Sequence, residues 1–238
     1  MEGMTIERHF LLVRHAESTK NVAMRLSGPV DSDRLSDQGY EESRQLASDL
    51  GSLIQAEFRQ ASVRVCASTS PRALETASVI GDILAAPVAS SELLCSMVVP
   101  ETGGLSEDQL REEFPESWRA LQLYRHGLRS SYTIEFIDGR LREFEKRVLL
   151  GLNEVAGGDG TVNLVVAHRS TITALLMHYA RRAGCISHDH YGFVPLDLLC
   201  VSLVSERAEC ARLEFVNRRG SELRGGLRTD GWPAVTIG

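Results

Sequence analysis

Two arginines and two histidines stand at or just beyond predicted strand ends in this 238-residue chain, and their side chains are suited to binding an anion. Arg14 and His15 end the first apolar run, Arg72 follows the loop after the second, and His168 follows the third. Arginine keeps its charge and binds phosphate oxygens through paired N–H groups. A neutral imidazole can attack phosphorus, which gives a covalent phosphohistidine. These residues predict phosphoryl-transfer chemistry with His15 as the nucleophile.

Three short apolar runs are the elements that must position these side chains. Residues 8–14, 62–67 and 162–167 predict buried strands, and a helical pattern follows each of them. Alternation of strands and helices favours a mostly parallel sheet that helices cover on both faces. Ligands of such sheets lie at the carboxyl ends of the strands. The sequence therefore predicts an α/β fold of three layers, α/β/α, in which the four side chains share one rim.

The rest of the pattern predicts further helices and a final pair of strands. We expect helices at 37–53, 71–84, 137–155 and 171–182. A short helix should begin after its N-cap, Ser106, and the segment 114–118 should end it. Residues 93–99 are expected to be extended, and 198–204 and 211–216 are expected to form paired strands. The charged positions of 138–147 are expected to form a solvated helix face. Residues 1–217 then make one domain, and the Gly- and Arg-rich segment 218–238 is a flexible tail.

Composition and charge limit the partners and the compartment. The formal net charge of −6 argues against a nucleic-acid-binding protein, because such proteins usually present a basic face. The five cysteines contain no Cys-x-x-Cys pair and several lie in apolar runs, so reduced, buried thiols are expected. No apolar run is long enough for a membrane span, and residues 1–8 lack the apolar segment of a leader. We expect a soluble, cytoplasmic protein with no membrane partner.

Three motifs occur in order at the predicted strand ends. They are Arg14-His15-Ala16-Glu17, the segment from Ser68 to Ala77, and Val165-Val166-Ala167-His168-Arg169. Asn21, the segment Leu35-Ser36-Asp37-Gln38-Gly39 and the last run, 213–217, accompany them. Together, over roughly residues 8–217, they resemble the histidine phosphatase superfamily, the phosphoglycerate-mutase-like proteins, whose signatures read Arg-His-Gly-Glu in the first motif and His-Gly in the third.

The resemblance implies a role for each matched residue. It implies that His15 is the phosphorylated nucleophile and that four residues bind the phosphoryl group: Arg14, Asn21, Arg72 and His168. Glu17 would hold a histidine or an arginine in orientation. The resemblance implies no metal ion and no cofactor. The expected partner is a small phosphorylated metabolite, and a homodimer stays open as the oligomeric state.

The usual proton donor is missing from its expected position. In the family a glutamate at the position of Ser96 protonates the leaving oxygen, and serine has no pKa near neutrality. Either Glu101 or Glu92 takes the role from a shifted position, or the substrate has a good leaving group such as an acyl, enol or anhydride phosphate. A third explanation is that the chain binds phosphate without turnover or catalyses another reaction. We favour the first, with Glu101 as the acid, because it lies in a Pro/Gly loop.

Two other features concern the surroundings of the anion pocket. Arg169 stands where the family signature has glycine, and it either extends the pocket or faces solvent. His188-Asp189-His190 could suggest a metal site, but no third ligand accompanies the pair, so a solvated loop is expected.

The leading hypothesis is a metal-independent phosphatase that hydrolyses a small phosphomonoester through a phosphohistidine. The alternatives are a phosphomutase or another transferase or lyase that uses the same pocket, and a phosphate-binding protein without catalysis.

Overall fold

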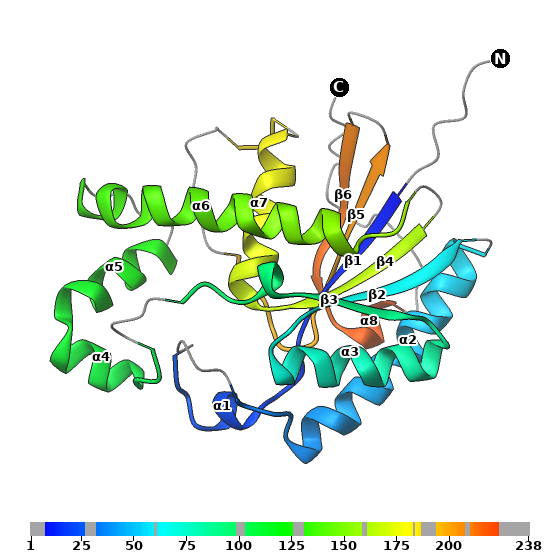
Figure 1. The fold of residues 1–238 in the computed structure, drawn as a ribbon, viewed down its shortest axis with the longest axis horizontal. Helices are drawn as coiled ribbons and strands as arrows, with labels where there is room; N and C mark the ends of the chain where they lie inside the picture. The colour runs from blue at the N-terminus through cyan, green and yellow to red at the C-terminus, as the bar shows by residue number, and fades with distance from the viewer. Residues whose placement is uncertain are drawn as a thin grey trace.

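One mixed sheet forms the centre of the molecule. A computed structural model of the chain describes residues 8–26, 32–59, 61–98, 103–125, 131–158, 161–182, 184–186, 194–207 and 210–223. Within these ranges six strands are ordered β3-β2-β4-β1-β5-β6 across the sheet (Figure 1). They are β1 (Arg8–Arg14), β2 (Ser62–Ser68), β3 (Val88–Ser91), β4 (Thr161–Ala167), β5 (Val201–Arg207) and β6 (Cys210–Arg218). The first four are mutually parallel, and β5 is antiparallel to both of its neighbours, β1 and β6.

The register of the three central strands brings their carboxyl ends level. β4 lies between β2 and β1, with Ala167 opposite Arg14 and Val166 opposite Ala67. The residues that follow β1 and β4, and the last residues of β2, therefore meet on one rim. This confirms the shared rim that was predicted for the three apolar runs.

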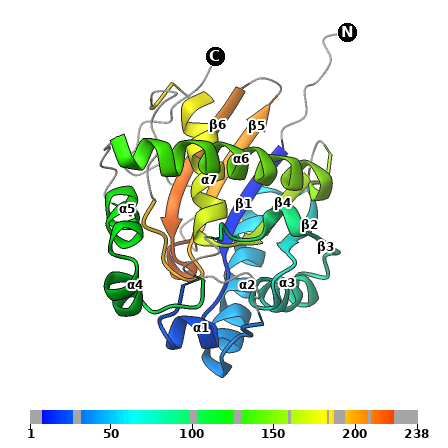
Figure 2. The same cartoon turned by 60° about the vertical axis from the view of Figure 1, so that its left-hand side comes forward.

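Helices cover both faces of the sheet, as Figures 1 and 2 show. Successive residues of a strand point to opposite faces. Leu11 and Val13 pack under α2 (Asp37–Glu57) and α3 (Pro71–Leu84), whereas Phe10 and Leu12 pack under α6 (Ser131–Val155) and α7 (Arg169–Arg182). β1 and β4 are apolar over most of their length because both of their faces are buried. The predicted three-layer α/β/α fold is confirmed.

Shorter elements gather on the side where β1, β2 and β4 end. In both views α1 (Thr19–Val22), α4 (Glu107–Glu113) and α5 (Pro115–Arg125) lie on this side (Figures 1 and 2). The 3-10 helix η1 (Glu92–Leu94) follows β3 directly. No helix within the described ranges combines the length and the apolar content that a membrane crossing requires.

The structure corrects several predicted elements. The 93–99 stretch begins inside η1 instead of being extended throughout, because Ser91 accepts a hydrogen bond from the Leu93 amide and starts a helical turn. Pro115 begins α5 rather than ending α4, since proline fits the first position of a helix, where its N–H is not needed. α6 begins at residue 131, six residues before the predicted start. The predicted pair of final strands forms as β5 and β6, which are antiparallel to each other. Their bounds differ by a few residues from the predicted ones.

The segment expected to be a flexible tail begins inside the fold. Arg218 ends β6, and α8 (Gly220–Leu223) follows it. Leu223 is buried in the cluster that also contains Leu46 and Leu50 of α2. Residues 224–238 lie outside the described part of the chain.

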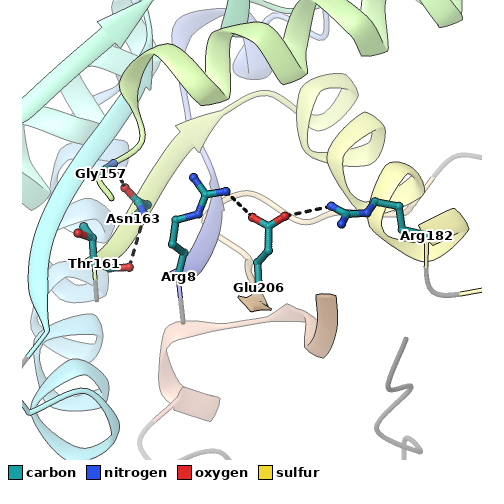
Figure 3. Close-up of polar contacts among 6 residues, drawn as sticks. All are labelled: Arg8, Gly157, Thr161, Asn163, Arg182 and Glu206. Atoms are coloured by element: carbon teal, nitrogen blue, oxygen red, sulfur yellow. Dashed lines mark hydrogen bonds and ion pairs between the residues drawn. The ribbon is translucent and has the colours of Figure 1, made fainter. Parts of the chain in front are cut away.

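Polar contacts hold together the opposite end of the sheet, where β1 and β4 begin (Figure 3). Glu206 accepts hydrogen bonds from Arg8 at 2.8 Å and from Arg182 at 3.0 Å, which joins β5, β1 and the end of α7. Asn163, fully buried in β4, accepts one from the Gly157 amide at 2.7 Å and donates one to the Thr161 carbonyl at 3.5 Å. These contacts therefore tie β1, β5 and the end of α7 together, and they tie Gly157 to β4.

Candidate active site

Two buried histidines lie together at the rim formed by the central strands. His15 follows β1 and His168 follows β4, and their side chains are among the most buried polar groups, with 4% and 2% of each residue exposed. The His15 amide donates to the Ala167 carbonyl at 2.9 Å, which continues the β1–β4 pairing by one residue. The ring centroids are 5.3 Å apart. The two histidines expected to share a site therefore do so.

Arg72 joins the two rings. It is the second residue of α3, which begins at Pro71, and it is 1% exposed. Its Nε donates to Nε2 of His15 at 3.0 Å, and its Nη2 lies 3.1 Å from Nδ1 of His168. The Thr76 hydroxyl donates to the Arg72 carbonyl and accepts from the Ala16 amide, which fixes α3 against the loop after β1.

These contacts determine where the imidazole protons lie. A guanidinium only donates hydrogen bonds, so the nitrogen of each ring that faces Arg72 presents a lone pair. His15 Nδ1 lies 2.7 Å from the Ala16 carbonyl and carries the proton. His168 Nε2 carries its proton toward the hydroxyls of Ser68 at 2.9 Å and Ser70 at 3.2 Å. His15 Nε2 therefore presents a lone pair, which the predicted nucleophile requires.

Burial and cations keep both imidazoles neutral. Burial lowers the pKa of His15 well below its ordinary value, and repulsion from a protonated His168 and from Arg72 lowers it further. Burial likewise lowers the pKa of His168, and the positive charges of Arg72 and then Lys20 lower it further. A neutral His15 at neutral and mildly acidic pH is the form that can attack phosphorus.

Arg14, the last residue of β1, is also buried at the rim. Its Nη1 donates to the Leu196 carbonyl at 2.5 Å, and its buried Nε has no hydrogen-bond partner among the described atoms. Burial, followed by the charge of Arg169, lowers the pKa of Arg14 to about 10. The charge of Arg169 therefore acts on Arg14, while the extension of the anion pocket by Arg169 stays a prediction.

Three kinds of residue at the site were not assigned a role from the sequence. Lys20 in α1 is 8% exposed and its charge acts on His168. It is one of only two lysines and lies directly before Asn21, which was the available signal. Ser68 and Ser70 hold His168, and in the sequence they stand out only as members of the second motif. Arg147 of α6 donates to the carbonyl of Cys95 at 2.8 Å and so is not on a purely solvated face. No local signal marked that contact.

Asn21 and Glu17 have local partners. The Asn21 Oδ1 accepts from the Ser18 hydroxyl at 2.7 Å and from its amide at 3.2 Å, and so caps α1. The Glu17 carboxylate accepts from the Ser36 hydroxyl at 2.7 Å, at the start of α2, and within the described ranges no histidine or arginine donates to it. The phosphoryl contact expected of Asn21 and the orienting role expected of Glu17 stay predictions.

Ser96 and Glu92, two of the positions considered for the proton donor, differ in their surroundings. The Ser96 hydroxyl lies 3.1 Å from that of Ser170, two residues after His168, so position 96 adjoins the site without carrying an acid. Glu92 is exposed in η1. Glu101 lies outside the described residues, as do His188, Asp189 and His190. Within the described ranges no three His, Cys, Asp or Glu side chains are grouped as metal ligands.

Residues 10–219 match the sequence model of the histidine phosphatase superfamily (branch 1). The chain belongs to this superfamily. The family inferred from the three motifs is confirmed. No curated protein sequence matches the chain.

Several solved structures resemble the chain over most of its length. A mycobacterial glucosyl-3-phosphoglycerate phosphatase in complex with VO3 has a TM-score of 0.66 at 21% identity, covering 88% of this chain and 98% of its own. A phosphoglycerate mutase from Bacillus anthracis has a TM-score of 0.67 at 17% identity, covering 94% and 99%. An alpha-ribazole phosphatase from Shigella flexneri has a TM-score of 0.62 at 22% identity, covering 89% and 96%. At these identities the similarity establishes the fold.

Proposed function

We propose that the protein is a metal-independent phosphatase that hydrolyses a small phosphomonoester through a phosphohistidine on His15. The observation that carries the proposal is the bridge made by Arg72. It donates to the Nε2 lone pair of His15 and to His168, in a site whose histidines are buried and neutral. The superfamily membership and the two phosphatases among the similar structures support the same reaction class.

The first step forms a bond between His15 Nε2 and phosphorus and breaks the bond to the leaving oxygen, which takes up a proton. Arg72 would then donate to phosphoryl oxygens instead of to imidazole nitrogens, and such charge-assisted bonds are stronger. Hydroxyls of Ser68 and Ser70 hold His168 in the orientation that places it beside the same group. In the second step water attacks the phosphohistidine, the N–P bond breaks, and orthophosphate and neutral His15 are released.

The test is phosphate release from a panel of phosphomonoesters by the wild type, His15→Ala and His178→Asn. His178 is the matched control, because it contacts Glu145 on the outer helices and not the rim. We expect the loss of the nucleophile to lower kcat/KM by a factor of about 10³ or more, while His178→Asn stays near wild type. No release from any ester, or equal release by His15→Ala, would contradict the proposal.

Hydrolysis is distinguished from mutase activity by the fate of the phosphoenzyme. The protein is labelled with a radioactive phosphoryl donor, and the labelled histidine is chased with buffer alone or with an excess of acceptor alcohols. We expect rapid release of orthophosphate in buffer alone. A phosphoenzyme stable in water that transfers its label to an alcohol would show a transferase instead.

The role of Glu101 as proton donor is tested by comparing two esters whose leaving groups differ in their need for an acid. If Glu101 protonates the leaving oxygen, Glu101→Gln should lower kcat/KM for an alkyl phosphate by about 10²-fold or more and hardly affect p-nitrophenyl phosphate, whose leaving group needs no acid. Equal effects on both esters would exclude that role. Ser96→Glu, placed beside Ser170, should raise alkyl phosphate hydrolysis only if the acid is missing altogether.

A further inference from the structure

One peptide group at the rim holds the side chain of Arg14. The carbonyl of the Leu196–Asp197 peptide accepts from Arg14 Nη1 at 2.5 Å, and the N–H of the same peptide donates to Oδ1 of Asn217 at 3.0 Å. A peptide group is a rigid plane, and in its trans form the C=O and the N–H point in opposite directions. The orientation of this plane, and with it the direction of the bond to Arg14, therefore depends on Asn217.

Asn217 reaches this peptide from a bulge at the end of β6. Leu203 of β5 pairs with Phe215 of β6. Two residues earlier on β5, Val201 pairs with Arg218, three residues further along β6. The extra residue of β6 bends the strand and redirects its side chains. Asn217 lies in this bulge with a φ of 58°, a left-handed conformation that asparagine tolerates better than most residues. Because β5 is antiparallel to both β1 and β6, this end of β6 lies at the same rim as the end of β1.

Both sides of the contact are held in place by further bonds. The Asn217 amide donates to the hydroxyl of Ser202, which is fully buried, at 3.1 Å. On the other side, the Cys200 amide donates to the Asp197 carbonyl at 3.4 Å and closes a turn in which Leu199 has a φ of 52°. Glycine is usual at that position of a turn, and another residue persists there only where its surroundings hold it. Leu199 is buried in the core, so the turn is fixed by packing.

The partner of Arg14 is a backbone carbonyl and not a carboxylate. A carbonyl oxygen orients a guanidinium without neutralising it, so the full charge of Arg14 stays available to an anion. The Nε of Arg14 is buried with no hydrogen-bond partner among the described atoms. The contact with the Leu196 carbonyl therefore sets the direction of a cation that still has a donor to offer.

We propose that Asn217 is a positioning residue for Arg14, and that it directs the guanidinium toward the phosphoryl position at His15 by fixing the Leu196–Asp197 peptide. The inference rests on the proposed function for the place of the phosphoryl group. Without the Asn217 side chain the Asp197 N–H loses its acceptor and the peptide plane is no longer fixed. Arg14 then keeps its charge and loses its fixed direction.

The test is a double-mutant cycle on the binding of orthovanadate, a tetrahedral oxyanion like phosphate, which calorimetry measures without turnover. The proteins are the wild type, Asn217→Gly, Arg14→Ala and the double variant. Glycine removes the side-chain acceptor and still adopts a φ of 58°, so the bulge stays accessible. Glu222→Ala is the matched control, because Glu222 is exposed and accepts from a backbone amide, that of Arg219 at 2.6 Å, just after β6. Circular dichroism and urea unfolding check that each variant is folded.

We expect Asn217→Gly to weaken vanadate binding about 3- to 10-fold, as the usual net contribution of one hydrogen bond predicts. In the Arg14→Ala background the same change should alter the affinity by less than about 2-fold, because coupled residues have non-additive effects. A purely structural role of Asn217 would weaken binding by the same factor in both backgrounds. Glu222→Ala should bind like the wild type. Additive effects, an unaltered affinity in Asn217→Gly, or no vanadate binding by the wild type would overturn the proposal.

The two proposals fail separately. Phosphate release that depends on His15, with additive effects of Asn217→Gly and Arg14→Ala on vanadate binding, would remove the positioning role and leave the phosphatase standing. Coupled effects on vanadate binding in a protein that releases no phosphate from any ester would do the reverse.

Discussion

Arg72 couples the two histidines through two different N–H groups. Its Nε faces His15 and its Nη2 faces His168, so a single planar group holds both rings. Under the proposed function both donors turn to one incoming phosphoryl group. A lysine ammonium is a point charge on a flexible stem and does not reproduce this fork. A positive charge at position 72 is therefore not enough to hold both histidine rings; the two N–H groups of the guanidinium are also required.

Arg72→Lys should consequently lower kcat/KM for p-nitrophenyl phosphate by about 10²-fold or more, the usual cost of losing a preorganised donor to transition-state charge. Steady-state kinetics measure the effect, and circular dichroism checks the fold. Arg44→Lys, on the exposed face of α2, is the matched control and should leave the rate unchanged. A wild-type rate in Arg72→Lys would show that the fork is not needed.

At the scale of elements, α2 is anchored directly against the loop that follows His15. The Ser36 amide donates to the Glu17 carbonyl at 3.1 Å, and the Ser36 hydroxyl accepts from the Gly39 amide at the start of the helix. A Cβ added to Gly39 would lie 2.1 Å from the Glu17 carbonyl oxygen, which is backbone and has no room to move aside. Glycine at position 39 is therefore a condition for this close approach.

Gly39→Ala should lower the free energy of unfolding by about 1–3 kcal/mol through overpacking. Gly51→Ala in the same helix is the control. Its Cβ would meet only the end of the Leu84 side chain at 3.1 Å, and alanine favours a helix by up to about 1 kcal/mol over glycine. Urea unfolding compares the two variants. If both have the same stability, the contact with Glu17 does not restrict position 39.

Glu206 joins three elements at the end of the sheet opposite the site (Figure 3). Because its side chain is only 11% exposed and accepts from both Arg8 and Arg182, Glu206→Gln should cost about 1–3 kcal/mol of unfolding free energy. Glu41→Gln, which removes an exposed pair with Arg44, should cost less than about 0.5 kcal/mol. Equal losses in urea unfolding would contradict a special role for the Glu206 contacts.

At the scale of the whole molecule, stability depends on pH through the two neutral histidines. Their folded-state pKa values lie below the ordinary value, so between those values and about 6.5 the unfolded chain binds more protons than the folded protein. Stability then rises with pH across this window, and it is lost as the pH falls below about 6.5. Each buried histidine contributes a slope of up to about 1.4 kcal/mol per pH unit.

His168→Asn should therefore flatten the dependence of unfolding free energy on pH between about 6.5 and 5, by up to the slope of one histidine. Urea unfolding at a series of pH values measures it, and the slope is informative even if the variant is less stable overall. His178→Asn, which alters a partly exposed ring paired with Glu145, is the control. An unchanged slope in His168→Asn would mean that His168 is not held neutral.

Local sequence alone determined the strands, most of the helices and the family, because apolar periodicity and the polar residues at strand ends depend only on near neighbours in the chain. It also identified Arg14, His15, Arg72 and His168. Their mutual geometry was decided by the tertiary structure, since β4 inserts between β1 and β2 and joins residues about 150 positions apart. The same pairing places Arg169 beside Arg14, and the packing of α1 and α6 brings Lys20 and Arg147 to the site. These contacts arise from register and packing between distant segments, which no local pattern encodes.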